Sequence, residues 1–581
     1  MRKFLILVMA ALLFVATFAA PVAAVPVADL AQLAVYFPEN TALFAAARTD
    51  DDFIETLDTV VSRVEAALPA GTLPVSTLTD ALDFAAMGID AEGDYESVIG
   101  SWLGDMIALG TSVPAADSSS QPVILAVAIT DAAAAEAFLT ANGGYENYDR
   151  TENDGYVLWS PSTRRSGQPF VIFREDVLII SMEAGNVETG GVQESPLSAV
   201  AGFNDTLALL PQDDYNVIVY TNFVEFLTGN PMMADAMAQA SPGMDMNAIF
   251  SAFGPQVYGA TILDGRSLTI DIVTSVDTAA MMESLGYGAI DMSAMNLTPV
   301  DPTFARFIPA GTPLVIHGTN LGAVTVQQAA SLPMILDSFV AQGMIEANDA
   351  RDARAALYGI GVVLRGLTGL TPEEAFGWMS GNYALYAGLS PSASDASGMM
   401  DLISSSPLDF ALTIEATDAA AATALVDGLL VGLLGQPLEE VTVVEKEIDG
   451  ASAFTIIIET PDLPFALEFM IATNENVLSI GTPRYVEFAL NPGAGLDTDP
   501  LFQTAAQYVL SDSAAVAYLS TEQFQSLVTV VAGMDDSAET QANAQIVSAL
   551  LSLVNSASIS GTVADADNGV TYARLVWTLP E

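Results

Sequence analysis

An internal repeat is the feature that most constrains how this 581-residue chain can fold. Landmarks of the first half return in the same order in the second half, at an offset of about 270 to 300 residues. They are a proline turn before a strand, a tryptophan followed by a glycine, an aspartate followed by four alanines, an apolar strand and a Gly-Met-Asp sequence. The matching pairs are Pro38 and Pro309, Trp102 and Trp378, Asp131 and Asp418, Val177 and Val477, and Gly243 and Gly533. One match arises easily by chance, but all of them in one order indicate a tandem duplication.

The same local elements are predicted in both repeats. Asp131 and Asp418 each follow a strand and precede an alanine-rich run, which predicts a helix capped by the aspartate because its carboxylate accepts the free amide hydrogens of the first turn. Tight hairpins are predicted at four turns, since glycine tolerates positive φ: Asp154-Gly155, Asp264-Gly265, Asp449-Gly450 and Asn568-Gly569. Strands joined by hairpins, rather than alternating with helices, favour an α+β fold with mostly antiparallel sheets.

We therefore expect two similar α+β repeats, residues 25–299 and 300–581, each long enough to bury its own core. Pro299 and Pro302 stand at the junction, and proline disfavours helices and central strands. Serine-rich loops at 115–121 and 390–406 occupy equivalent places in the two repeats. One continuous sheet shared between the halves is the alternative architecture.

These landmarks resemble a bacterial family of exported or membrane-anchored proteins known only as a domain of unknown function, number 3352 in its series. The resembling features are the proline openings, the glycine-centred strands after the tryptophans, the Asp-Ala-Ala helix starts and the Val-Leu strands: Pro38, Pro309, Trp102, Trp378, Asp131, Asp418, Val177 and Val477. The resemblance covers most of the chain and implies the α+β architecture. It implies no activity, because none is assigned to the family.

The N-terminus has the pattern of a cleavable secretory signal peptide over residues 1–24. Arg2 and Lys3 supply positive charge, and the apolar run from Phe4 to Phe18 is shorter than the ~20 residues that span a bilayer. Small residues precede Val25, so we expect the mature chain to begin there, in a secreted or envelope location. An uncleaved membrane anchor is the alternative, whereas a lipoprotein is excluded because the sequence has no cysteine. No disulfide or thiolate zinc site can form for the same reason.

Acidity is the most unusual feature of the composition, with 71 Asp and Glu against 16 Lys and Arg and a net charge of −55. A field of that sign repels phosphate backbones and anionic lipid headgroups, which makes nucleic-acid binding improbable. Dispersed carboxylates on a large alanine-rich protein indicate a solvated surface. We expect no stable membrane insertion after signal cleavage.

Catalytic signatures are missing. His317 is the single histidine and lies in an apolar strand, which favours a core role, and a triad would have to use it. Lys446 lies between two glutamates and is typical of a solvated ion pair. The sequence has no phosphate-loop, dinucleotide or nucleophile-elbow motif. Acid pairs such as Glu373-Glu374 or Glu439-Glu440 permit glycoside hydrolysis in principle but are uninformative among 71 acids.

Metal binding by oxygen or thioether ligands is the other chemistry that the composition permits. Four compact acidic groups could bind calcium weakly: Asp50–Asp52, Asp213-Asp214, Asp497 with Asp499, and Asp565 with Asp567. An Asn-Gly hairpin turn with solvated carboxylates is the alternative explanation for Asp565 and Asp567. A methionine cluster could bind Cu(I) or simply fill helix faces: Met232, Met233, Met237, Met244 and Met246. No cofactor is predicted, and no metal site is assigned.

Export, duplication and the missing motifs together favour a non-enzymatic binding or interaction scaffold at the cell envelope, with an extracellular or envelope protein as partner. A carrier of an apolar ligand is the first alternative, because 51% of the residues are hydrophobic. An acid-pair hydrolase is the second.

Overall fold

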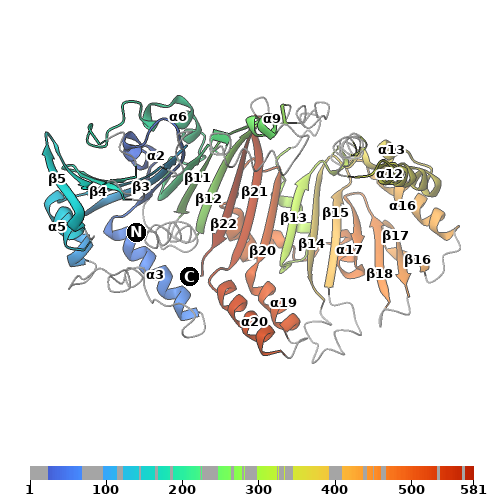
Figure 1. Cartoon of the computed structure of the whole chain (residues 1–581). Coiled ribbons are helices and arrows are strands. Elements are labelled where there is room, and N and C mark those ends of the chain that lie inside the picture. Colours follow the sequence, from blue (N-terminus) through green and yellow to red (C-terminus); the bar gives the residue numbers. More distant parts are fainter. Residues whose placement is uncertain are drawn as a thin grey trace. The chain divides into compact units, whose positions relative to one another are not determined.

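The fold is α+β with large antiparallel sheets, as seen in a computed structural model of the chain (Figure 1). The structure describes residues 24–67, 96–113, 122–142, 145–163, 168–182, 187–222, 224–225, 246–263, 267–277, 280–281, 298–323, 325, 333, 336, 340, 345–390, 408–435, 441–448, 450–459, 466–532, 537–565 and 569–580. None of the helices in these ranges is both long enough and apolar enough to span a bilayer. The predicted signal peptide and both serine-rich loops fall largely outside these ranges.

The chain divides into two compact units. The first extends to Met281 and includes Asp567–Tyr572; the second comprises Met282–Ala566 and Ala573–Pro580. The predicted boundary at residues 299 and 300 stays a prediction, because residues 282–297 are not among those described.

The first unit is built on one antiparallel sheet of the order β5-β6-β7-β8-β4-β3-β2-β10-β11-β12. Its strands are β2 (Thr41–Arg48), β3 (Leu103–Ser112), β4 (Val123–Ile129), β5 (Tyr148–Asn153), β6 (Tyr156–Pro161), β7 (Phe170–Phe173), β8 (Val177–Ser181), β10 (Val217–Thr221), β11 (Phe253–Leu263) and β12 (Ser267–Val276). A separate two-stranded ladder joins β1 (Val25–Pro26) to β9 (Asp214–Tyr215).

Both faces of this sheet are covered. On one face an aromatic core lies under α2 (Val27–Leu30), η1 (Gln32–Tyr36) and α6 (Ala201–Leu207). In this core the rings of Phe44 and Phe203 pack edge to face with centroids 5.6 Å apart. On the other, α5 (Ala132–Asn142) packs its Ala135 and Phe138 against Trp102 and strands β4, β7 and β8. Helix α3 (Asp51–Ala67) follows β2. Alternating side chains of the strands supply both cores, as the period of two requires.

The second unit contains an antiparallel sheet of the order β16-β17-β18-β19-β15-β14-β13-β20-β21. The strands are β13 (Leu314–Thr319), β14 (Asn382–Leu389), β15 (Leu408–Glu415), β16 (Val441–Ile448), β17 (Ala451–Ile458), β18 (Leu467–Thr473), β19 (Val477–Gly481), β20 (Ala515–Ser520) and β21 (Ser556–Asp565), with β22 (Val570–Thr578) at the C-terminal end. The prediction of largely antiparallel sheets is confirmed.

Helices also cover both faces of the second sheet. One core contains Tyr386 and Tyr485 under η6 (Pro302–Phe307), α17 (Pro483–Leu490), η7 (Leu496–Thr498) and α18 (Pro500–Ala506). The other contains Trp378 and Phe454 under α12 (Ala347–Thr368), α13 (Pro372–Phe376) and α16 (Ala419–Leu434). Helices α19 (Thr521–Ala532) and α20 (Ala538–Leu551) connect β20 to β21 along the chain and pack on each other.

The local predictions about caps and turns are confirmed wherever the structure describes them. Asp131 accepts from the Ala134 amide at 2.9 Å, and Asp418 accepts from the amides of Ala420 and Ala421. Gly155 and Gly450 adopt φ values of 81° and 71° at the tips of their hairpins. The Asp264-Gly265 turn lies outside the described residues.

Candidate functional site

A cleft of about 400 Å³ opens in the first unit, between the N-terminal half of α5 and the tips of two hairpins. The β5–β6 hairpin contributes Glu152 and Tyr156, the β7–β8 turn contributes Arg174 and Glu175, and α5 contributes Glu136. Alanines at the start of α5 and Phe173 on β7 provide an apolar floor. Concave, partly apolar pockets with a few convergent polar groups are the usual places where proteins bind small ligands or peptide side chains.

The hairpin register brings the charged groups together. Arg150 and Glu152 are two residues apart on β5, so both side chains point to the sheet face that α5 covers. Trp159 of β6 lies directly opposite Arg150. Its ring joins the core beneath α5, which places the indole N–H below Glu136.

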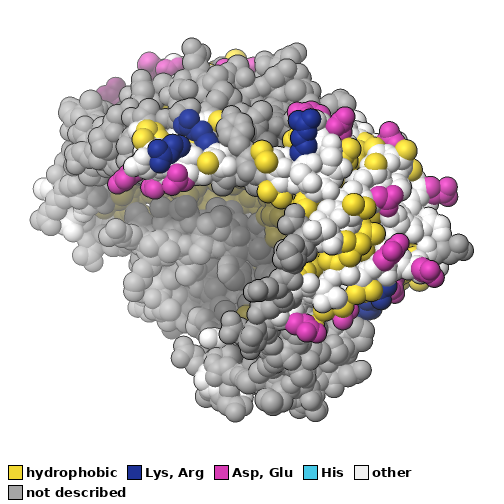
Figure 2. Space-filling view, turned by 90° about the vertical axis from the view of Figure 1, so that its right-hand side faces the viewer, with side chains coloured by type: hydrophobic (Ala, Val, Ile, Leu, Met, Phe, Trp, Pro, Cys, Tyr) yellow, Lys and Arg dark blue, Asp and Glu magenta, His cyan; other side chains and the backbone are white. Residues whose placement is uncertain are grey.

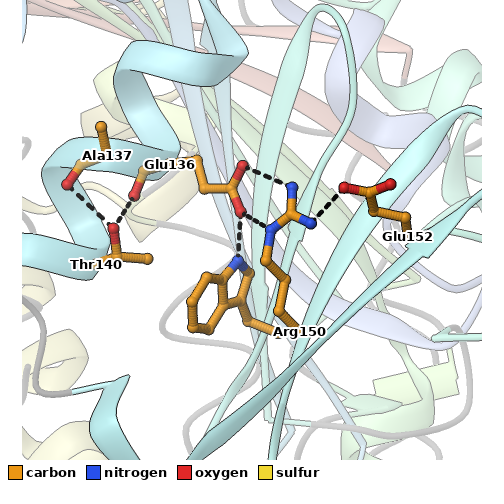
Figure 3. Close-up of polar contacts among 6 residues, drawn as sticks. Glu136, Ala137, Thr140, Arg150 and Glu152 are labelled. Atoms are coloured by element: carbon orange, nitrogen blue, oxygen red, sulfur yellow. Dashed lines mark hydrogen bonds and ion pairs between the residues drawn. The ribbon is translucent and has the colours of Figure 1, made fainter.

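Arg150 bridges two carboxylates, as Figure 3 shows. Its Nε lies 2.6 Å and its Nη2 3.3 Å from the two oxygens of Glu136, and its Nη1 lies 2.5 Å from Glu152 Oε1. The indole nitrogen of Trp159 donates to Glu136 Oε1 at 2.7 Å. The Glu136 side chain is therefore mostly buried, with 19% of its surface exposed, whereas the Glu152 side chain is 74% exposed at the rim of the cleft.

Electrostatics keeps Glu136 ionised. The hydrogen bond from Arg150 lowers the pKa of this carboxyl, burial opposes that shift, and the Trp159 indole lowers it further. Glu136 and Glu152 in turn raise the pKa of Arg150. The three groups form a charge-assisted network that fixes the hairpin to α5.

Arg174, on the opposite side of the cleft, is likewise held by neighbours. Its Nη1 donates to the Gly190 carbonyl at 3.3 Å, and it hydrogen-bonds to Tyr36. Burial raises the pKa of Tyr36, Asp176 adds to that effect, and Arg174 opposes it. The hydroxyl of Tyr156 donates to the Glu188 carbonyl at 3.0 Å, and its ring packs against the core on the sheet face opposite α5.

His317 lies in β13 of the second unit, and its side chain belongs to the core, as predicted. It is 6% exposed and stacks on Phe304 with centroids 5.5 Å apart. The Nε2 atom lies 3.2 Å from Asn382 Oδ1, while Asn382 Nδ2 donates to Glu415 Oε2 at 2.8 Å. Because the carboxylate can only accept, the amide oxygen of Asn382 faces the imidazole, and Nε2 carries the proton.

The surroundings of His317 disfavour its cationic form. Burial lowers its pKa, and the hydrogen bond to Asn382 and the charges of Asp301 and Glu415 oppose that shift without reversing it. Asp301 also caps η6 and donates its backbone N–H to Asn382 Oδ1 at 2.8 Å. Through its contacts with Phe304 and Asn382, His317 thus connects η6 to the sheet of the second unit.

Several of the acidic groups singled out in the sequence have structural partners. Asp50 forms an ion pair with Arg48 at 2.6 Å and accepts from the Phe53 amide. Asp499 caps α18 and accepts from Gly311 N at 3.0 Å. Within the described ranges, no three acidic or histidine side chains are grouped so as to hold one metal ion.

Two of the remaining candidates, Lys446 and Glu374, lie within the described residues. Lys446 is exposed on β16, and Glu374 closes a capping box with Thr371 at the start of α13. Glu439, Glu440 and Asp567 lie outside the described residues, as do four of the five methionines and the side chain of Met246. Neither Lys446 nor Glu374 is among the residues that line the cleft. Figure 2 shows carboxylates scattered among apolar side chains over the described part of one face.

The fold and the cleft define the protein as an α+β protein with antiparallel sheets and a carboxylate-rich pocket. It belongs to the family described as "Protein of unknown function (DUF3352)", whose sequence profile matches residues 4–579. No curated protein and no solved structure matches the chain. The family resemblance seen in the sequence is therefore confirmed over nearly the whole chain.

Proposed function

We propose that this protein is an exported, non-enzymatic binding protein of the cell envelope, and that the cleft beside α5 is its ligand site. The observation that carries the proposal is the combination of a 400 Å³ opening with carboxylates that Arg150 and Trp159 hold in place. Preorganised polar groups around an apolar floor lower the entropic cost of binding.

The state of Glu136 favours binding over acid-pair hydrolysis. A glycosidase needs one carboxylic acid that is protonated when the leaving group departs. Both oxygens of Glu136 accept hydrogen bonds from Arg150, and its pKa is lowered rather than raised. Glu136 is therefore unsuited to the general-acid role, and this cleft supports a hydrolase poorly.

An apolar-ligand carrier has less support than a polar binding site. A small cavity beside Phe53 is lined by apolar residues of β10, β11 and β12 together with Asn216 and Thr261, and it has a volume of about 10 Å³. That volume holds about one water molecule and no lipid chain. The cleft beside α5, in contrast, has charged walls.

A tandem duplication of one α+β unit accounts for the scaffold. Each sheet begins with a four-strand meander, passes through two neighbouring strands to β2 or β13, and continues through β10 to β11 in the first unit and through β20 to β21 in the second. The capped helices α5 and α16 follow equivalent strands, β4 and β15. Two copies of one ancestral unit would produce this shared order.

Export and an envelope partner complete the proposal. The predicted signal peptide supports export, and strand β1 begins at Val25, the expected mature N-terminus. The strong negative charge disfavours nucleic acid and anionic lipid and leaves an extracellular or envelope protein as the favoured partner. Weak divalent cation binding at the acidic surface stays open.

Photo-crosslinking tests the proposal in the source organism. A photoreactive amino acid at Asn153, on the exposed end of β5, should crosslink to a specific envelope component, and the same group at Glu447 of the second unit is the matched control. Loss of the adduct in the Glu152→Gln, Glu175→Gln double variant would assign it to the cleft. Equal crosslinking from both positions, or none from Asn153, would refute the cleft as the binding site.

A further inference from the structure

We propose that the cleft beside α5 recognises an organic cation, an alkylammonium or guanidinium group such as a lysine or arginine side chain of a basic peptide. This inference rests on the proposed function, because it names the ligand class of the same site. It follows from which charges at the cleft are already paired.

Both guanidinium groups near the cleft already have hydrogen-bond partners. Arg150 directs Nε and Nη2 to Glu136 and Nη1 to Glu152. Arg174 is occupied by the Gly190 carbonyl and Tyr36. A ligand carboxylate or phosphate would compete with these partners and would meet the carboxylates that line the cleft.

The N-terminal end of α5, which lies at the cleft, provides little stabilisation for a bound anion. The N-terminal amides of α5 would normally favour negative charge, but Asp131 already accepts from Ala134 N at 2.9 Å. The aspartate charge also offsets the positive end of the helix. A cation therefore meets no opposing field from α5.

Carboxylates, by contrast, are in excess at the cleft. Glu136, Glu152 and Glu175 line it, against Arg174 in the lining and Arg150 beside it. Glu175 is exposed on the β7–β8 turn, and Glu152 uses one oxygen for Arg150. These two groups can accept hydrogen bonds from an entering ammonium or guanidinium, and the net charge of −55 attracts such a ligand from a distance.

The walls suit the stem that carries such a cation. Ala132, Ala133 and Phe173 give the cleft an apolar side, along which the methylene groups of lysine or arginine can pack. A metal ion fits less well, since the described residues contain no group of three carboxylates converging on one point.

The test uses the whole exported chain and the indole N–H resonance of Trp159, one of only four tryptophans. Because this N–H donates to Glu136, a cation entering the cleft should shift it. The probes are the peptide acetyl-Ala-Arg-Ala-Lys-Ala-amide, its counterparts with Glu or Gln at both charged positions, and spermidine. We expect shifts with the basic peptide or spermidine, and the stronger of the two identifies the source of the cation.

The variants assign the effect to the cleft. Glu152→Gln and Glu175→Gln should each weaken binding of the cationic probe by up to about fivefold, as expected for exposed ion pairs, and the losses should combine. Glu447→Gln removes one exposed carboxylate from β16 and should leave the affinity unchanged. Unaltered melting temperatures would show that the variants fold normally.

The outcomes separate the ligand class from the proposed function. If the Glu or Gln peptide shifts Trp159 as strongly as the basic peptide, the cleft binds ligands but the cation inference is wrong. If no probe shifts Trp159 while crosslinking from Asn153 still depends on the cleft, the cation inference alone fails. If both experiments give nothing, the proposed function falls with it.

Discussion

His317 offers the sharpest test of the electrostatics of the fold, because the chain has no other imidazole. Burial lowers its pKa in the folded state below the unfolded value of about 6.5. Between the two pKa values the unfolded chain binds one more proton than the folded chain. The stability contributed by the neutral imidazole is therefore complete above pH 6.5 and is lost as the pH falls.

The magnitude follows from proton linkage. While the unfolded state holds the extra proton, the free energy of unfolding of the second unit should fall by about 1.4 kcal/mol for each pH unit below about 6.5. The loss ends at the folded pKa, where His317 becomes charged within the native structure. Asp301 and Glu415 limit the shift, since their charges favour the imidazolium.

Two measurements check this reasoning. A proton NMR titration should show one histidine Cε1–H resonance with a midpoint below 6.5. The variant His317→Gln can still donate an amide hydrogen toward Asn382 Oδ1 but has no proton to gain, so its melting temperature should depend less on pH between 6.5 and 5. A folded-state midpoint at or above 6.5 would refute burial as the dominant influence.

Three other predictions concern charge, processing and autonomy. The melting temperature should rise as the NaCl concentration goes from low to near-molar, because counterions within a Debye length of ~10 Å at 0.1 M relieve the repulsion among the carboxylates. An unchanged melting temperature would contradict dispersed surface acidity, and a rise with calcium but not with magnesium at equal ionic strength would indicate an oxygen-ligand site. N-terminal sequencing of the exported protein should begin at Val25, and a chain retaining Met1 would point to an uncleaved anchor. The fragment Val25–Thr298 should melt cooperatively and give dispersed amide resonances. Its melting temperature should be lower than that of the first unit in the whole chain, because the fragment lacks Gly569, whose carbonyl accepts from Val276 N at 3.0 Å. A molten fragment would argue against autonomous repeats.

Local features of the fold could be predicted from the sequence because they depend on neighbouring residues. Asp131 and Asp418 cap their helices, and Gly155 and Gly450 turn their hairpins, through interactions within a few positions. The pairing of distant strands, such as β4 with β8, depends on contacts that no local pattern specifies.

The cleft could not be predicted for a related reason. Glu136 is one of 71 acidic residues, and nothing in its immediate sequence distinguishes it. The hairpin does carry a usable signal: a turn at Asp154-Gly155 places Arg150 opposite Trp159 and puts Glu152 on the same face. What the sequence could not supply is the height of α5 above that face, which the packing of Ala135 and Phe138 sets.

The capped helix is used differently in the two units. In the second unit α16 carries Gly428 and Gly432, and an added Cβ at either position would lie within 3.0 Å of backbone atoms of Thr368 or Leu367. The missing side chains let α12 pack closely along α16, and Phe454 fills the space beneath it. In the first unit α5 instead presents Glu136 to Arg150 and Trp159, so charged side chains lie beside this helix, whereas α16 packs against α12. Each unit has its own core to maintain its stability, so the proposed duplication would permit a polar opening beside α5 together with a packed helical layer beside α16.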